Sequence, residues 1–211
     1  MTDVHETIQL VRVAAGMPRV IGQNRDGDVL SGIAKRELNQ PNIIVRQTNI
    51  DGDGQADLRN HGGIDKAVYC YPREHRARWA EEIGYDQEEA PFGENLSVTG
   101  IFEDEARIGD VWQWGTAILQ ISQPRWPCYK LAMHSGHRDM VKRFVESGRS
   151  GWYLRVLQEG VAPTSGAIQI VERDDLEVTV REAMLARRGK LDPSEATRVY
   201  EHPALAAAWA P

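Results

Sequence analysis

The chain has 211 residues, of which 27% are charged, and a formal net charge of −6. A chain of this length buries roughly 70% of the surface that its unfolded form exposes, so its core needs no disulfide support. The negative charge argues against nucleic acid as a partner, although local basic loops can still bind a small anion. No apolar run approaches the roughly 20 residues of a membrane span, so we expect no membrane association.

The two cysteines lie in different sequence surroundings. Cys70 lies inside the apolar run 67–71 and is predicted to belong to the core, whereas Cys128 lies in a proline-rich loop. Two such dissimilar positions do not suggest a disulfide, and they fit a reducing compartment. Residues 1–6 show no basic region followed by an apolar run, so no signal peptide is predicted. We therefore expect a cytoplasmic protein.

Short apolar segments punctuated by Gly, Asn and Asp dominate the first two thirds of the chain, a pattern typical of strands. The expected strands are 8–13, 33–38, 43–46, 66–71, 95–98, 110–114, 117–123 and 168–172. Many short strands without regular alternation with helices indicate a barrel or a sandwich. The predicted fold class is therefore mixed α+β and mainly β.

Two helices are expected within this region. Pro72 suits the first position of a helix that runs to about residue 83, and Gly84 suits its C-terminal cap. Residues 136–147 form the second, because their apolar side chains recur at helical spacing.

The character of the chain changes near residue 176. Thr179 and Glu182 form a capping box that opens a short helix. Another helix is expected to follow Asp192, which would be its N-terminal cap, with Pro193 at the first helical position and Glu195 at the third. Two or three short helices thus follow the strands. We predict a β-barrel domain with inserted helices over 1–173 and a small C-terminal helical region over 174–211.

The loop around Cys128 holds the strongest chemical signal. Pro124 and Pro127 stiffen the backbone beside the thiol, and a predicted strand leads into the loop. Arg125 and Lys130 favour the thiolate, the form that attacks electrophiles and binds soft metals. Cys128 is thus a candidate nucleophile or metal ligand. The alternative, a small buried hydrophobic side chain, stays open at this point.

Two glycine-containing segments are further candidates. In 61–66, a Gly-Gly pair allows the backbone to approach a ligand closely, and the side chains of His61 and Lys66 on either side could donate hydrogen bonds to an anion. The alternative is that the segment is simply a tight turn. In 92–96, a glycine turn precedes Asn95, whose side chain can both donate and accept, although an ordinary turn into a strand is favoured.

Two metal-binding interpretations are disfavoured. The acidic segment 51–57 departs from the EF-hand pattern, with Ala56 in place of glycine and Gly62 in place of glutamate, so a structured turn is expected. His134 and His137 could bind zinc together with Cys128, but no fourth ligand is evident, and a polar helix start is favoured.

Six motifs in order and spacing resemble a known family. They are Asp-Gly-Asp-Gly-Gln at 51–55, His-Gly-Gly-Ile-Asp-Lys-Ala at 61–67, Tyr-Pro-Arg-Glu-His at 71–75, Phe-Gly-Glu-Asn-Leu at 92–96, Ile-Gly-Asp at 108–110 and Ser-Gln-Pro-Arg-Trp-Pro-Cys-Tyr-Lys-Leu at 122–131. Together they resemble the MOSC-domain family, named for the C-terminal domain of molybdenum cofactor sulfurase, and in particular its bacterial YiiM group, linked to hydroxylaminopurine resistance.

The resemblance implies a β-barrel with helical additions and a bound molybdenum cofactor, in which molybdopterin holds the metal. Cys128 is implied to be the protein thiolate that ligates molybdenum. The pterin and its phosphate need polar partners, for which the matching motifs offer Asn95, Ser122, Arg125 and Lys130, followed by Lys66 and His61 of the glycine turn.

The activity implied is reduction of N-hydroxylated compounds, such as hydroxylamino bases, to amines. We expect a separate reductase to supply electrons, and His61 to act as the proton donor because histidine titrates near neutrality. Two alternatives stay open. One is a non-catalytic carrier of the cofactor or of sulfur, and the other is a metal-free thiol enzyme acting through Cys128.

Overall fold

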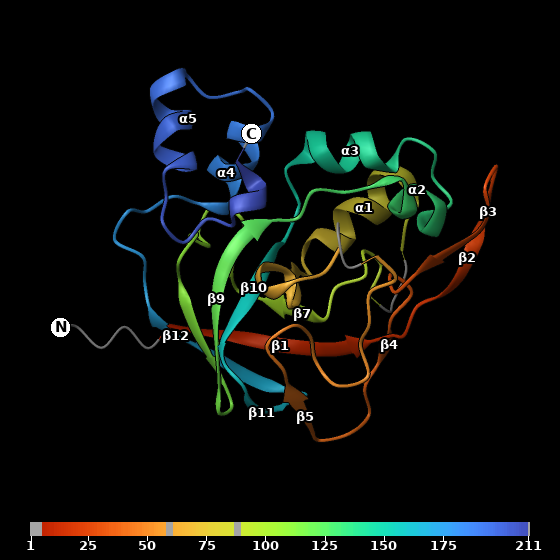
Figure 1. Cartoon of the computed structure of the whole chain (residues 1–211), viewed down its shortest axis with the longest axis horizontal. Coiled ribbons are helices and arrows are strands. Elements are labelled where there is room, and N and C mark those ends of the chain that lie inside the picture. Colours follow the sequence, from red (N-terminus) through yellow and green to blue (C-terminus); the bar gives the residue numbers. More distant parts are fainter. Residues whose placement is uncertain (1–5, 58–60, 87–89, 211) are drawn as a thin grey trace.

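The structure, a computed structural model, describes residues 6–57, 61–86 and 90–210. Seven strands form a closed mixed barrel in the order β12-β8-β9-β10-β6-β7-β1, and β1 pairs with β12 to close it (Figure 1). The barrel strands are β1 (Glu6–Ala15), β6 (Val68–Pro72), β7 (Leu96–Thr99), β8 (Val111–Trp114), β9 (Ala117–Pro124), β10 (Trp152–Gln158) and β12 (Gly166–Glu172). Only β6 and β7 pair in parallel within it. The predicted mainly β barrel is thus confirmed.

Buried and exposed residues alternate along the strands, and the buried ones form the barrel core. In β1, Ile8, Leu10 and Val13 are buried, while Gln9 and Val11 between them are exposed. Ile8 pairs with Ile168 of β12, and Leu10 pairs with Val98 of β7, so both neighbours place apolar side chains on the inner face. The register is therefore fixed by burial, because a slip of one residue would turn these side chains to the solvent.

Smaller elements complete the sheet structure. β4 (Arg36–Glu37) pairs with the end of β1, β2 (Arg19–Asn24) and β3 (Gly27–Ser31) form a hairpin that projects from the body, and β5 (Asn42–Val45) pairs with β11 (Gly160–Pro163) (Figure 1). The predicted strand 33–38 therefore shrinks to β4. The hairpin, β10 and β11 were not predicted. No residue of β2 is fully buried, so that strand lacks the apolar alternation on which the prediction relied.

Three helices, α1 (His75–Ile83), α2 (Tyr129–Ser135) and α3 (Met140–Ser147), lie together beside the barrel (Figure 1). They pack on an aromatic cluster that is separate from the barrel core and consists of Ile33, Tyr69, Tyr71, Trp79, Tyr85, Phe92, Leu131, Met140 and Phe144. Gly84 ends α1 in the left-handed conformation, as predicted.

The predicted starts of the two inserted helices were wrong. Pro72 ends β6, where it pairs with Val98, because burial between strands outweighs the preference of proline for a helix start. Gly136 ends α2 in the left-handed conformation rather than opening a helix, so the second helix begins at Met140. Lys66, predicted as strand, ends the short 3-10 helix η1 (Ile64–Lys66).

The C-terminal segment forms α4 (Val180–Arg187), α5 (Pro193–Tyr200) and the 3-10 helix η2 (Ala207–Trp209). Both predicted capping boxes, at Thr179 and at Asp192, are present. Buried side chains of this segment belong to the same core cluster as the barrel strands, and the domain boundary near residue 174 stays a prediction. No described helix is long and apolar enough to span a membrane.

β9 positions the functional region. It ends at Pro124, between α1–α3 on one side and α4, α5 and η2 on the other (Figure 1). The loop that follows leads through Cys128 into α2. Side chains from the two helical groups and from the barrel end can therefore meet around this loop.

The capping box at Thr179 gives the first prediction. The Thr179 hydroxyl accepts from the backbone N–H of Glu182 at 3.1 Å, so Thr179→Ala leaves that N–H without its partner. We expect Thr179→Ala to lower the free energy of unfolding by about 1 kcal/mol in urea denaturation. Thr179→Ser keeps a hydroxyl and should stay close to wild type. An equal loss in both variants would show that the hydroxyl is not the cause.

Candidate functional site

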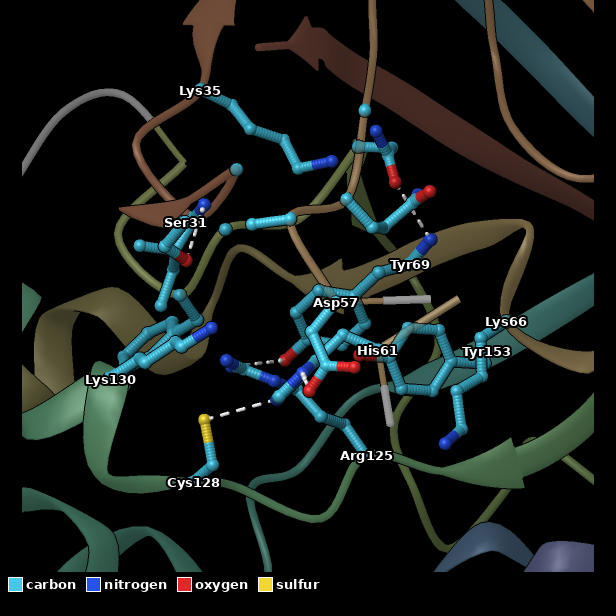
Figure 2. A pocket seen from close by; sticks show the side chains of 18 residues that line it. Ser31, Lys35, Asp57, His61, Lys66, Tyr69, Arg125, Cys128, Lys130 and Tyr153 are labelled. Atoms are coloured by element: carbon cyan, nitrogen blue, oxygen red, sulfur yellow. Dashed lines mark hydrogen bonds and ion pairs between the residues drawn. The ribbon is translucent and has the colours of Figure 1, made fainter. Parts of the chain in front are cut away.

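A pocket opens at the end of the barrel where the loop after β9 meets the loops that precede β6 and β7 (Figure 2). We call it the inner pocket. Its empty space, counted together with its open mouth, is about 600 Å³. It is lined by Ser31, Gly32, Ile33, Lys35, Gly54, Gln55, Ala56, Asp57, His61, Lys66, Tyr69, Phe92, Gly93, Asn95, Arg125, Cys128, Lys130 and Tyr153.

Cys128 faces the inner pocket and pairs with His61 (Figure 2). Cys128 is the residue immediately before α2, and its extended backbone turns the chain from the proline loop into that helix. Its Sγ lies 3.2 Å from Nε2 of His61. On the other side of the ring, Nδ1 of His61 lies 3.6 Å from a carboxylate oxygen of Asp57. The three side chains thus form a chain of acid, imidazole and thiol.

The surroundings of Cys128 favour its thiolate. Burial raises its pKa, but the hydrogen bond and charge of His61, the backbone N–H of Lys130 and the charge of Arg125 together lower it to about 7. The prediction that Arg125 favours the thiolate agrees with this balance. The largest contribution to stabilising the Cys128 thiolate comes from His61, and sequence reasoning did not predict this contact.

Arg125 supplies a buried positive charge to the inner pocket. Its guanidinium lies 4.8 Å from the ring centre of Tyr69 and 5.4 Å from that of Phe144, and Nη1 lies 3.4 Å from the Tyr69 hydroxyl. Among the described residues, no carboxylate forms an ion pair with it. Aromatic faces compensate a buried cation only in part, so this position favours an anionic ligand.

The opposite wall is held by the carboxylate of Asp53. It accepts hydrogen bonds from the backbone N–H of Gly16 at 3.0 Å, from Lys35 Nζ at 2.5 Å and from Asn95 Nδ2 at 3.0 Å. Asn95 also donates to the carbonyl of Ala14 and accepts from the backbone N–H of Tyr69. Both amide donors of Asn95 are therefore used within the protein, so this side chain braces the wall.

Gly93 is required at the rim of the inner pocket. Its φ is +76°, and a Cβ there would lie 2.7 Å from Cγ1 of Ile33. Any other residue would be strained in its backbone and would push the 31–35 segment away. The predicted glycine turn before Asn95 is thus a close contact between two loops of the pocket.

Most of the predicted site residues meet in the inner pocket, but Ser122 does not. Lys66 and Lys130 line it together with Cys128, His61, Asn95 and Arg125. Ser122 is fully buried, and its hydroxyl lies 2.6 Å from the carbonyl oxygen of Asp65 and 3.0 Å from that of Tyr153. It therefore bridges backbone segments behind the pocket.

Two other candidates, Cys70 and His137, do not line the inner pocket. Cys70 is fully buried, and burial raises the pKa of its thiol well above its usual range, as expected for a core residue. The ring of His137 packs against Tyr85 with ring centres 5.7 Å apart. No group of three or more His, Cys, Asp or Glu side chains in the described part of the chain is placed to hold a metal ion.

Lys35, Tyr69 and Asp57 are among the polar residues of the pocket that sequence reasoning missed. Lys35 was assigned to a strand, Tyr69 was placed in a core strand, and Asp57 was treated as part of a turn. Only Asp57 carried a local signal, because it lies four residues before His61. The other two reach the pocket through tertiary packing alone.

On the other side of Cys128 lies a second depression, which we call the outer groove. It is lined by Asp57, His61, Lys66, Gln123, Trp126, Pro127, Cys128, Tyr129, Lys130, Tyr153, Arg187, Ala208 and Trp209. It shares the thiol and the imidazole with the inner pocket, so Cys128 and His61 lie between the two cavities.

Comparison with known protein families assigns this chain to one of them. The model of the MOSC domain matches residues 57–176, more than half of the chain, so the chain belongs to the MOSC-domain family. Within that family it is similar to YflK of Bacillus subtilis, at 39% identity over 83% of this chain and 79% of the relative. It is also similar to YiiM of Escherichia coli, at 36% identity over 85% and 81% of the two chains.

Solved structures give the same assignment. YiiM from Geobacillus stearothermophilus superposes with a TM-score of 0.79 at 32% identity, covering 96% of this chain and 95% of that one. YiiM from Escherichia coli gives a TM-score of 0.77 at 28% identity. A protein of Gibberella moniliformis named "Reductase" is 32% identical over 78% of this chain, which matches only 29% of that longer protein.

The Cys128–His61 contact predicts a shift in thiol reactivity. In wild type, we expect the alkylation rate of Cys128 by iodoacetamide to reach half its maximum at a pH of about 7. His61→Ala removes the main group that stabilises the thiolate, so the midpoint should rise toward about 8.5. Peptide mass spectrometry would follow Cys128 and confirm that buried Cys70 stays unmodified. His137→Ala is the control, and an unchanged midpoint in His61→Ala would contradict the assignment.

The Lys35–Asp53 pair predicts a large effect on stability. Both side chains are almost fully buried, so Asp53→Asn leaves the Lys35 ammonium without its carboxylate. We expect the free energy of unfolding to fall by about 3–5 kcal/mol in urea denaturation. Adding Lys35→Met to Asp53→Asn should restore part of this loss, since it removes the unpaired charge. A double variant less stable than Asp53→Asn would contradict this explanation.

Proposed function

We propose that this protein is a molybdenum-cofactor-dependent reductase of N-hydroxylated compounds in which the Cys128 thiolate ligates the metal. The observation that supports the proposal most is the Cys128 thiol itself, with its pKa lowered to about 7, at the junction of two cavities. A soft metal binds a deprotonated sulfur, and the local charges already favour that form.

The other residues of the inner pocket fit the organic part of such a cofactor. Arg125 offers a buried cation that no carboxylate among the described residues pairs, and Lys130 adds a second positive charge beside it. Tyr153, which is only partly buried, adds an aromatic ring to the lining. The two cations match an anionic pterin in charge.

The reaction would convert an N–OH group to N–H and release water, consuming two electrons and two protons. When bound, the cofactor would supply the redox chemistry at the oxygen. His61 lies beside the thiolate, with Nδ1 near Asp57, so it can hold a proton near the reacting centre and deliver it to the departing oxygen. A separate reductase would provide the electrons.

Metal and pterin analysis tests this proposal. Wild type, Cys128→Ala and Cys70→Ala would be produced in a host that makes the cofactor, and molybdenum would be measured by mass spectrometry and pterin by fluorescence. We expect metal in wild type and in Cys70→Ala, and its loss in Cys128→Ala. Wild type without molybdenum, or Cys128→Ala that retains it, would overturn the proposed ligation.

Turnover separates the reductase from a carrier. Loaded wild-type protein with a chemical electron donor should reduce a hydroxylamino base to the amine, and His61→Ala should be slower by about 10²-fold if its proton is used. Bound cofactor without turnover on several N-hydroxylated compounds would instead favour the non-catalytic carrier.

A further inference from the structure

The outer groove has its own wall, contributed by the C-terminal segment. Arg187 at the end of α4 donates to the carbonyls of Ala208 and Trp209, at 3.4 and 3.2 Å. Its guanidinium lies 5.1 Å from the ring centre of Trp126 and 4.7 Å from that of Trp209. These contacts fix the guanidinium at the groove while leaving the residue exposed.

The charge of this wall is positive. Lys66 and Arg187 both line the groove, and Arg187, after burial, is the second cause of the lowered pKa of Lys66. The carboxylates of Asp65 and of Asp57, which also lines the groove, act on that pKa in the opposite direction but more weakly. No acidic side chain in the described part of the chain pairs with Arg187. Two neighbouring cations repel each other in a half-buried site, and a bound anion relieves that repulsion.

The rest of the groove suits a flat ligand. Trp126 and Tyr129 line it and remain exposed at 39% and 53%, so their rings offer accessible aromatic surface.

We propose that the outer groove is the substrate site and that Arg187 and Lys66 bind an anionic substituent of the substrate, a carboxylate or a phosphate. An aromatic ring bearing that substituent would lie against Trp126 and Tyr129, which directs the rest of the molecule toward Cys128. This inference rests on the proposed reductase only for the identity of the reacting N–OH group. The anion site itself requires no cofactor.

Binding to the cofactor-free protein tests the anion site directly. Tryptophan fluorescence would be titrated with benzoate and phenyl phosphate, and with neutral benzyl alcohol as the matched ring. We expect at least one anion to bind about tenfold more tightly than benzyl alcohol. The stronger of the two identifies carboxylate or phosphate as the preferred group.

Four variants locate the site. Arg187→Gln and Lys66→Gln should each weaken the preferred anion by about tenfold while leaving benzyl alcohol unchanged. Arg187→Lys keeps the charge and should retain most of the affinity, which separates charge from the packing of Arg187 on Trp209. Arg188→Gln is the control, because Arg188 does not line the groove. Thermal unfolding of each variant checks that it is folded.

The outcomes are distinct from those of the proposed function. Equal binding of the anions and benzyl alcohol, or equal loss in Arg187→Gln and Arg188→Gln, overturns the anion site whatever the metal assay shows. If the protein turns over, 4-carboxybenzamidoxime should have a higher kcat/KM than benzamidoxime when carboxylate is the preferred group, and Arg187→Gln should bring the ratio toward one. If the anion binds as expected but wild-type protein from the host that makes the cofactor contains no molybdenum, only the proposed reductase is overturned.

Discussion

The Asp53 carboxylate is the constraint on which the site depends. It joins the backbone after β1, the Lys35 side chain and Asn95 before β7, and Asn95 in turn is tied to the backbone of β6. These segments are far apart in sequence. The buried carboxylate fixes the positions of these segments relative to one another, because the loss of any hydrogen bond would leave an unpaired polar group in a low-dielectric interior. The same network keeps one wall of the inner pocket in place.

The opposite wall of the inner pocket is formed by the end of β9 and, in the part of the chain that the structure describes, is not held by a buried ion pair. The barrel strand β9 delivers Arg125 and Cys128 to the pocket, and its pairing with β10 continues to Pro124. Arg125 is compensated there by tyrosine and phenylalanine rings rather than by a carboxylate within the described residues. A carboxylate in that place would offset the contribution of Arg125 to the lowered pKa of Cys128, which adds to the larger contribution of His61. The wall thus combines a rigid strand end with a positive charge, which favours the thiolate over the thiol.

The C-terminal segment connects fold and proposed function in another way. Its helices share the barrel core, yet Arg187 and Trp209 also reach the groove on the far side of Cys128. Cys128 and His61 consequently lie between two cavities of different character. The inner one is framed by close loop contacts such as that of Gly93, and the outer one is lined by two cations and by exposed aromatic side chains. Such a division fits a bound cofactor on one side and an exchanging small molecule on the other.

The sequence by itself determined the features that depend on local chemistry. Six of the seven barrel strands, both capping boxes and the buried Cys70 follow from neighbours a few residues apart. Only the tertiary structure decided that Pro72 ends a strand and that Ser122 lies behind the pocket. It also decided that His61 touches Cys128 across 67 positions of sequence and that Lys35 meets Asp53. Contacts of this kind arise from closure of the barrel, which brings loops together without leaving a periodic or spacing signal in the chain.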